Sequence, residues 1–398
     1  MALHTDAVYE VLLRCVALGC WWPLPHVCRS WRDACRRLVV NVSVKFRTLS
    51  RADCRSLAAH LACFDTARSS LNLMHTDIED ASVLAHLGHV KLGGTKVSDV
   101  SAFGGVKSLD IAGAPVSDVS ALHGLEELNA MYTKVVDVSM LGGLRRLDVS
   151  CTNVSDASAL GGLQHLDISW TKVTDMSALG KLDRLDAGLT NPTNLAALRN
   201  VRHLDLEGAD VSDVSALTGV SVLNLSNTHV VDVSALWGAH TVMLVNCPVA
   251  DASRLGRVTV LNLSGTKVHD VSALGQVREL NLSNTDVSDV SALTGVVTLC
   301  LCDCVYVRDV SKLGAVRNLD LGYTSVTDVS ALGQVETLDL TGTKVSNIMD
   351  LTGVRTLHLT HSLVTVIPMD FAFSTVVLPC GVRMVKKNSA WSASVEWV

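Results

Sequence analysis

The chain has 398 residues, of which 48% are hydrophobic and 18% charged, and its formal net charge is −6. No uninterrupted apolar run reaches the roughly 18 residues that a membrane helix needs, so we expect no membrane-spanning segment and no membrane partner. The length exceeds that of one ordinary globular core, but it does not force a split into domains, because a fold can also grow by stacking.

The first part of the chain differs in charge from the rest. Residues 1–60 carry nine Lys or Arg and four Asp or Glu, so this segment is basic on an acidic chain. Apolar residues at helical spacing predict one helix over 6–18 and a second over 24–40, with arginines on one face of the second helix. Since that face lacks interleaved aromatic residues, we interpret it as solvated and expect no nucleic-acid partner.

The two predicted helices carry a short motif. The sequence VLLRCVAL at 11–18, followed by PLPHVCRSWRDACRRLV at 23–39, resembles an F-box, although His4-Thr5-Asp6 stands where the family usually has Leu-Pro. F-box segments dock on the Skp adaptor of cullin–RING ubiquitin ligases. The resemblance implies that residues 1–58 bind the Skp adaptor and cullin complex through Val11, Leu12, Leu13, Val27 and Trp31. The alternative is a helical cap, because an open repeat array needs its first repeat covered.

The remainder is dominated by one period. VVDVSMLGGLRRLDVSCTN at 135–153 is followed directly by VSDASALGGLQHLDISWTK at 154–172, a repeat of 19 residues. Self-similarity at this period predicts a solenoid. About fifteen units follow the register, and they begin at Ile78, Val97, Val116, Val135, Val154, Val173, Pro192, Val211, Val230, Val249, Val268, Val287, Val307, Val326 and Val345. The Val287 unit has a twentieth residue, and we expect a bulge near its Cys300, Cys302 and Cys304.

Each unit contains the pattern L-x-x-L-x-L-x-x-T-x-V, as in Leu144, Leu147, Val149, Thr152 and Val154. This pattern resembles the leucine-rich repeat, and the V-S-D-V-S-A-L segment resembles internalin-type repeats with a shortened convex side. The resemblance implies an α/β leucine-rich repeat solenoid with a parallel concave sheet and short 3₁₀ convex turns. We therefore predict an F-box-like helical cap over 1–58, the solenoid over 59–363 and a C-terminal cap over 364–398.

An acidic residue recurs at the third position of the units. A ladder of carboxylates can bind calcium. Asp or Asn before a short turn also accepts hydrogen bonds from unpaired backbone N–H groups, and we favour this structural role and expect no metal. The ladder comprises Asp80, Asp99, Asp118, Asp137, Asp156, Asp175, Asp213, Asp232, Asp251, Asp270, Asp289, Asp309 and Asp328, with Asn194 and Asn347 in two other units.

Specificity in a repeat protein is expected where the pattern is broken on an exposed face. Position 17 of the units is usually Gly or Asn, but four consecutive units carry Tyr132, Cys151, Trp170 and Leu189. These residues either bind a partner or only cover the edge of the sheet. The protein-binding surface predicted from them and their neighbours comprises Met131, Tyr132, Arg146, His165, Trp170, Arg184 and Leu189. Val222, Met243, Val245 and Val260 form either a second patch or a packing irregularity.

No motif for catalysis is present: the glycines follow the repeat, and there is no phosphate-binding loop, H-E-x-x-H or nucleophile elbow. We expect no enzyme and no cofactor. The cysteines lack zinc-finger spacing, which favours reduced thiols in a cytoplasmic or nuclear protein. The favoured function is a substrate-recognition subunit of a ubiquitin ligase, with an unknown protein on the concave face. The alternative is a non-catalytic scaffold, because the repeats also resemble those of protist proteins described as putative adenylate cyclase regulators.

Overall fold

The computed structural model describes residues 41–43, 51–62, 65–367, 373–378, 382–387 and 390–395. The predicted adaptor-binding residues Val11, Leu12, Leu13, Val27 and Trp31 lie outside the described residues, so their role stays a prediction. The chain divides into two compact units, Met1–Asp148 and Val149–Val398, called here the first unit and the second unit. A unit named by its first residue, such as the Val154 unit, is one repeat of the 19-residue period.

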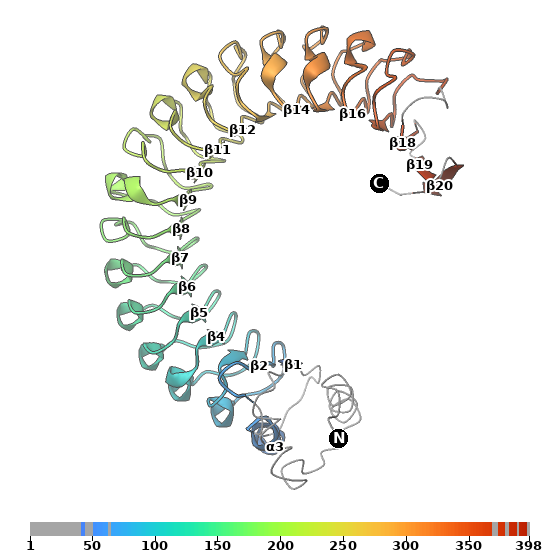
Figure 1. Ribbon diagram of the computed structural model, residues 1–398. Helices are drawn as coiled ribbons and strands as arrows, with labels where there is room; N and C mark the ends of the chain where they lie inside the picture. The colour runs from blue at the N-terminus through green and yellow to red at the C-terminus, as the bar shows by residue number, and fades with distance from the viewer. Residues whose placement is uncertain are drawn as a thin grey trace. The chain divides into compact units, whose positions relative to one another are not determined.

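In the first unit, short strands pair in parallel, and from β2 onwards each strand begins 19 residues after the one before (Figure 1). The strands are β1 (Asn41–Ser43), β2 (Ser70–Asn72), β3 (His89–Lys91), β4 (Ser108–Asp110), β5 (Glu127–Asn129) and β6 (Arg146–Asp148). Helix α3 (Arg51–Leu61) lies between β1 and β2 in the chain and buries Cys54, Leu57 and Leu61. The boundary expected at residue 58 stays a prediction, and α3 runs across it.

The second unit continues the same design. Its parallel strands are β7 (His165–Asp167), β8 (Arg184–Asp186), β9 (His203–Asp205), β10 (Val222–Asn224), β11 (Thr241–Met243), β12 (Val260–Asn262), β13 (Glu279–Asn281), β14 (Thr298–Cys300), β15 (Asn318–Asp320), β16 (Thr337–Asp339), β17 (Thr356–His358) and β18 (Thr375–Val377). The hairpin β19 (Val382–Lys387) and β20 (Ala390–Val395) pairs antiparallel with β18. Strand β18 keeps the 19-residue spacing after the boundary predicted at residue 364.

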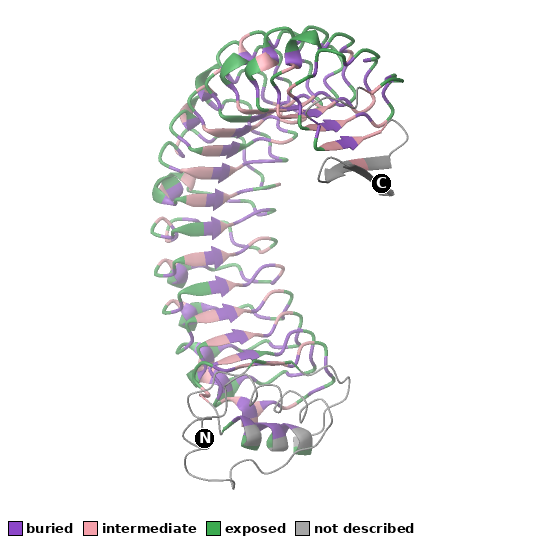
Figure 2. Ribbon diagram, turned by 45° about the vertical axis from the view of Figure 1, so that its right-hand side comes forward, coloured by how far each residue is buried: buried purple, intermediate pink, exposed green. Residues whose placement is uncertain are grey.

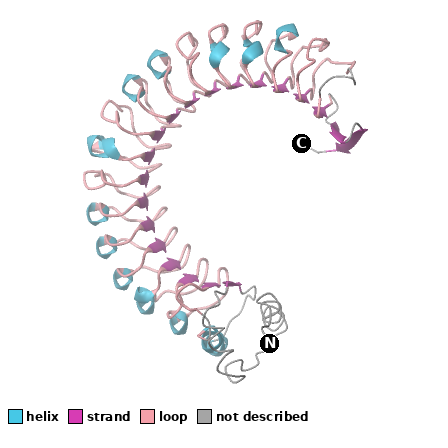
Figure 3. Ribbon diagram, in the orientation of Figure 1, coloured by secondary structure: helices cyan, strands magenta, loops and turns pink. Residues whose placement is uncertain are grey.

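Within each unit the strands line the inner edge and short 3₁₀ turns line the outer edge (Figure 3). In the first unit these turns are η2 (Ser82–Leu84), η3 (Ser101–Gly105), η4 (Ser120–Leu122) and η5 (Ser139–Leu141). In the second they are η6 (Ser158–Leu160), η7 (Leu195–Asn200), η8 (Ser234–Leu236), η9 (Ser253–Leu255), η10 (Leu293–Gly295), η11 (Leu313–Ala315) and η12 (Ser330–Leu332). The predicted parallel sheet with 3₁₀ convex turns is confirmed.

The core follows directly from the repeat. In the Val154 unit the side chains of Val154, Ala157, Leu160, Leu163 and Leu166 are each at most 3% exposed, and the same positions are buried in neighbouring units. Strand residues on either side of the buried leucine face the solvent, which gives the alternation of colours along the inner strands in Figure 2. Within each compact unit, stacking of similar repeats therefore makes a column of buried Val and Leu side chains.

Two polar positions close the turns. The position-18 threonine hydroxyl donates to the carbonyl of position 15, as from Thr152 to Val149 at 2.6 Å, so Thr supplies the expected backbone bond. The third-position aspartates, called here the turn aspartates, accept the amide of the serine two residues on, as Asp99 does from Ser101 at 2.9 Å. The predicted structural role of the turn aspartates is thereby confirmed.

Two expectations need correction. Asn194 does not take the place of a turn aspartate: its backbone is left-handed, with φ of 58°, and its amide donates to Asp175 at 2.9 Å. The twentieth residue of the Val287 unit does not bulge the strand, because β14 keeps regular pairing with β13 and β15. The extra residue is accommodated in the loop after Cys304, where Val305 and Tyr306 are exposed. Loops tolerate insertion more easily than a paired strand.

Candidate functional site

The backbone just past each strand is left-handed at position 17. In the second unit, Cys151, Trp170 and Leu189 have φ values of 56°, 57° and 56°. Other repeats place Gly or Asn there, as at Gly208 and Asn227, and these residues tolerate this conformation at little cost. Bulky residues with this backbone are unusual and strained, which makes them candidates for function. The Trp170 and Leu189 side chains are 62% and 46% exposed.

The first unit carries three of the predicted partner-binding residues. Tyr132 is 65% exposed on a left-handed backbone, and Met131 beside it is half-buried. Arg146 on β6 lies 3.7 Å from the Glu127 carboxylate of β5. The expected continuity of an apolar strip from Tyr132 to Leu189 joins the two units and stays a prediction.

In the second unit, Trp170 and Leu189 border an open hollow of about 580 Å³. Leu189 leans over the next repeat, since a Cβ placed on Gly208 would lie 2.7 Å from its Cδ2 atom. Residues of the strands and of the turns just after them form the rest of the lining, which comprises Asp167, Ser169, Arg184, Asp186, Gly188, Asp205, Glu207, Gly208 and Asn227. The hollow thus has an apolar wall and an acidic floor.

The floor is a row of carboxylates held by the sheet register. Asp167, Asp186 and Asp205 are direct neighbours on β7, β8 and β9. The Arg184 guanidinium donates from Nε to both oxygens of Asp186, at 3.2 and 3.0 Å. The hydrogen bond to Asp186 raises the pKa of Arg184, and the charges of the other two aspartates add to this effect. The single Arg184 guanidinium therefore lies among three carboxylates, and the net charge of the hollow stays negative.

Beside this row, a hydrogen-bonded network fixes a fourth carboxylate. The Asn224 amide donates to Asp205 at 3.1 Å and to Glu207 at 3.2 Å, and the Asn227 amide donates to the other oxygen of Glu207 at 3.2 Å. The Glu207 amide in turn donates to Asp205 at 2.8 Å. The two carboxylates are held in place before any partner arrives, which lowers the entropy cost of binding.

A second, smaller hollow adjoins the first on the same face. It has a volume of about 140 Å³, shares Arg184, Asp186 and Asp205 with the first, and is bordered by Val222 and Met243. Met243 is 39% exposed on β11, and Val222 and Val260 on neighbouring strands are half-buried. A concave surface with Trp170 and Leu189 at one end and Met243 at the other therefore surrounds the central Arg184–Asp186 pair.

The structure brings Trp170, Arg184 and Leu189 together, and His165 lies on the strand next to Arg184 with its Nε2 3.9 Å from Asp183. Sequence reasoning did not select Asp205, Glu207, Asn224 or Asn227 as site residues. A signal for Glu207 was present, because position 16 of the other units holds uncharged residues.

The surroundings of Cys300 and Cys302 favour protonated thiols. Cys300 lies 3.0 Å from the Ser283 hydroxyl and 3.2 Å from Asp320, and burial raises its pKa to about 11. Burial likewise raises the pKa of Cys302 to about 12. In the described part of the chain, no group of three or more His, Cys, Asp and Glu residues could hold a metal ion. Nor does any helix there combine the length and apolar character needed to cross a bilayer.

Comparison with known proteins identifies the fold. No family model and no curated protein sequence matches the chain. A leucine-rich repeat protein of Leptospira interrogans matches 79% of this chain and 92% of its own, with a TM-score of 0.57 and 17% identity. The functional domain of InlJ from Listeria monocytogenes matches 76% and 74%, with a TM-score of 0.55 and 20% identity. The plant peptide hormone receptor RGFR1, in complex with RGF2, matches 75% and 60%, with a TM-score of 0.53 and 14% identity.

These likenesses show that the chain has the leucine-rich repeat fold, and they confirm the predicted similarity to internalin-type repeats.

Proposed function

We propose that this chain is a non-catalytic protein-binding protein whose concave face, around Trp170, Arg184, Leu189 and Met243, recognises a segment of a partner protein. The observation that carries the proposal is the pair of adjoining hollows that share Arg184, Asp186 and Asp205. Exposed aromatic and apolar side chains next to an arginine are typical of interface hot spots. A receptor of the same fold, RGFR1, is known in complex with RGF2.

The charges of the site indicate the kind of segment it would bind. Four carboxylates, those of Asp167, Asp186, Asp205 and Glu207, face one guanidinium across the larger hollow. A Lys or Arg of the partner would be attracted to Asp205 and Glu207, while a neighbouring apolar side chain would pack on Trp170 and Leu189. We therefore expect a basic residue next to an apolar residue in the recognised segment.

The finer proposal is that the partner is a substrate for ubiquitin transfer. The F-box-like residues of segment 1–58, Leu12, Leu13 and Trp31 among them, support binding of the Skp adaptor, with the solenoid selecting the substrate. The alternative is a scaffold or regulatory protein without a ligase role, in which segment 1–58 only caps the first repeat.

The experiment compares three forms of the full-length chain in cells. The first is unchanged, the second carries Leu12→Asp and Leu13→Asp, and the third carries Trp170→Gly and Glu207→Gln. Co-purifying proteins are quantified by mass spectrometry. Glu279→Ala serves as a control on the concave face, because Glu279 is exposed at the strand position of Arg184, but on the distant β13.

We expect the third form to lose one set of partners that the Glu279 control keeps. If the unchanged and third forms recover the Skp adaptor and a cullin while the second form does not, the ligase proposal stands. Recovery of concave-face partners by a soluble unchanged chain without any adaptor would instead favour the scaffold. Equal recovery of every partner by the third form would contradict recognition at this surface.

A further inference from the structure

The outer edge of the second unit carries three residues that break the repeat side by side. Trp237 stands at position 8, where most units have Gly or Thr, and Arg254 stands at position 6, where most units have Ala. Arg257 occupies position 9, which is Gly in more than half of the units. All three positions face outwards and carry no part of the core, so the repeat itself does not require these large residues.

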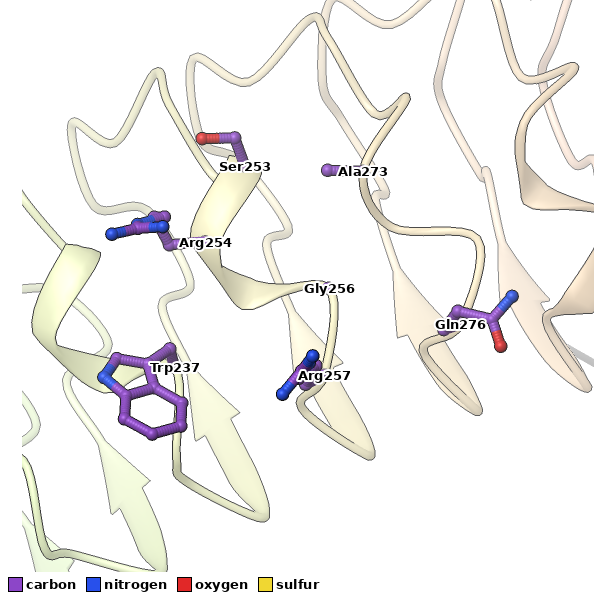
Figure 4. Close-up of a pocket in the computed structure, with 7 residues that line it drawn as sticks. All are labelled: Trp237, Ser253, Arg254, Gly256, Arg257, Ala273 and Gln276. Carbon is purple, nitrogen blue, oxygen red and sulfur yellow. The ribbon is translucent and has the colours of Figure 1, made fainter.

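These three residues border one hollow. It has a volume of about 550 Å³ and lies between adjacent repeats, with Ser253, Gly256, Ala273 and Gln276 completing its lining. Figure 4 shows Trp237 at the end of η8 and the Arg254 guanidinium extending from η9 toward the repeat that carries Trp237. Trp237 is 56% exposed, and the two arginines and Gln276 are also exposed. An indole face and two guanidinium groups therefore surround one concavity.

The hollow on the outer edge is lined by positive charges, whereas the concave site is mainly negative. Among the described residues, no carboxylate lies within ion-pair distance of Arg254 or Arg257. The nearest turn aspartates are already engaged, since Asp251 accepts the Ser253 amide at 2.8 Å. Two guanidinium groups that have no carboxylate partner in the described part of the chain can donate to an anionic group, and Arg suits carboxylate in a bidentate geometry.

We propose that the hollow between Trp237, Arg254 and Arg257 is a second binding site, which takes a short acidic protein segment. Two neighbouring carboxylates of the segment pair with Arg254 and Arg257, and an apolar side chain covers the indole of Trp237. A nucleic acid fits less well, because the turn aspartates follow the same outer edge and would repel an extended polyanion. The site lies on the edge opposite the concave site, so both segments could be held at once.

The test pans a random dodecapeptide phage library on the full-length chain. Bound peptides are sequenced, and one enriched peptide is titrated by fluorescence anisotropy against variants. The variants Trp237→Thr, Arg254→Ala and Arg257→Gly each restore the residue that other units carry at that position, so folding is expected to survive. Lys312→Ala and Lys181→Gly are matched controls, because these exposed lysines occupy the positions of Arg254 and Arg257 in other units.

We expect enriched peptides to contain at least two Asp or Glu beside an apolar residue. Their affinity should fall at least tenfold with Arg254→Ala combined with Arg257→Gly, and stay within twofold for both lysine controls. Absence of acidic enrichment, or unchanged affinity of the double variant, overturns the proposal. Arginine-dependent binding of a 30-nucleotide single-stranded RNA tighter than any peptide overturns it in favour of nucleic acid. A sedimenting dimer that the double variant loses identifies a second copy of the chain as the occupant instead.

Discussion

Replacing Trp170 by Ala and by Gly separates two contributions to the free energy of unfolding: the strain of the left-handed backbone and the contacts of the indole side chain. Both changes remove the same indole contacts, so the difference between them reports the φ of 57°. A left-handed backbone costs an L-residue roughly 1–2 kcal/mol, whereas Gly adopts it freely but loses more freedom on folding. We therefore expect Trp170→Gly to be about 1 kcal/mol more stable than Trp170→Ala.

Lys172 provides the reference, because it is exposed in the same repeat and its φ is not positive. There Gly should be less stable than Ala by about 0.5–1 kcal/mol, the ordinary order of the two residues. The assay is urea unfolding of the full-length variants, with native-state hydrogen exchange of amides in this repeat as a local measure. If Ala equals or exceeds Gly in stability at residue 170, the backbone is not strained, and the functional significance drawn from it fails.

Three further outcomes are expected. The Ser amides and hydroxyls hold the pKa values of most turn aspartates, such as Asp99, below the ordinary value, so their stabilisation is present above the unfolded pKa and is lost as pH falls through the folded values. The urea concentration at the unfolding midpoint should therefore decrease once the pH is below about 4. Asp-to-Asn changes at several turn aspartates should make this decrease smaller, since Asn347 accepts the same bond. Thr152→Val removes the donor to a buried carbonyl and should cost about 1–3 kcal/mol, while Thr152→Ser costs less, as urea unfolding would measure. Cys300 and Cys302 should react with iodoacetamide at pH 7.5 far more slowly than a free thiol, because their pKa values are raised to about 11 and 12, and alkylation as fast as glutathione would contradict this.

The fold was predictable because every 19-residue repeat carries a similar pattern of buried Leu and Val positions. A 19-residue period with Leu at fixed positions allows one inward face, and the structure buries that face in unit after unit. Departures from the period were harder to interpret. The additional residue of the Val287 unit could enter strand or loop, and its position depends on backbone pairing that side-chain pattern does not encode. Asn194 looked equivalent to an aspartate, but its left-handed backbone points the amide elsewhere.

The site was predictable only in part. Trp170 and Leu189 stood out because they replace Gly and Asn, while Asp205 did not, because most repeats have Asp or Asn at the same strand position. The place of Asp205 in the site depends on the Asn224 side chain, which reaches it from the next strand, and on the backbone amide of Glu207 two residues further on. Asn224 and Asn227 contact carboxylates that lie 17 to 20 residues earlier in the sequence, so the pattern within one repeat does not show these contacts.

The left-handed turn after each strand also bears on how such a chain changes over generations. The turn geometry is set by hydrogen bonds between adjacent repeats, such as that from the Trp170 amide to the Gly188 carbonyl at 3.0 Å, and not by the side chain at position 17. That position accepts Gly, Asn, His, Tyr, Trp and Leu on the same backbone. Duplication of a repeat followed by one codon change can thus alter the exposed surface while every buried residue is inherited unchanged.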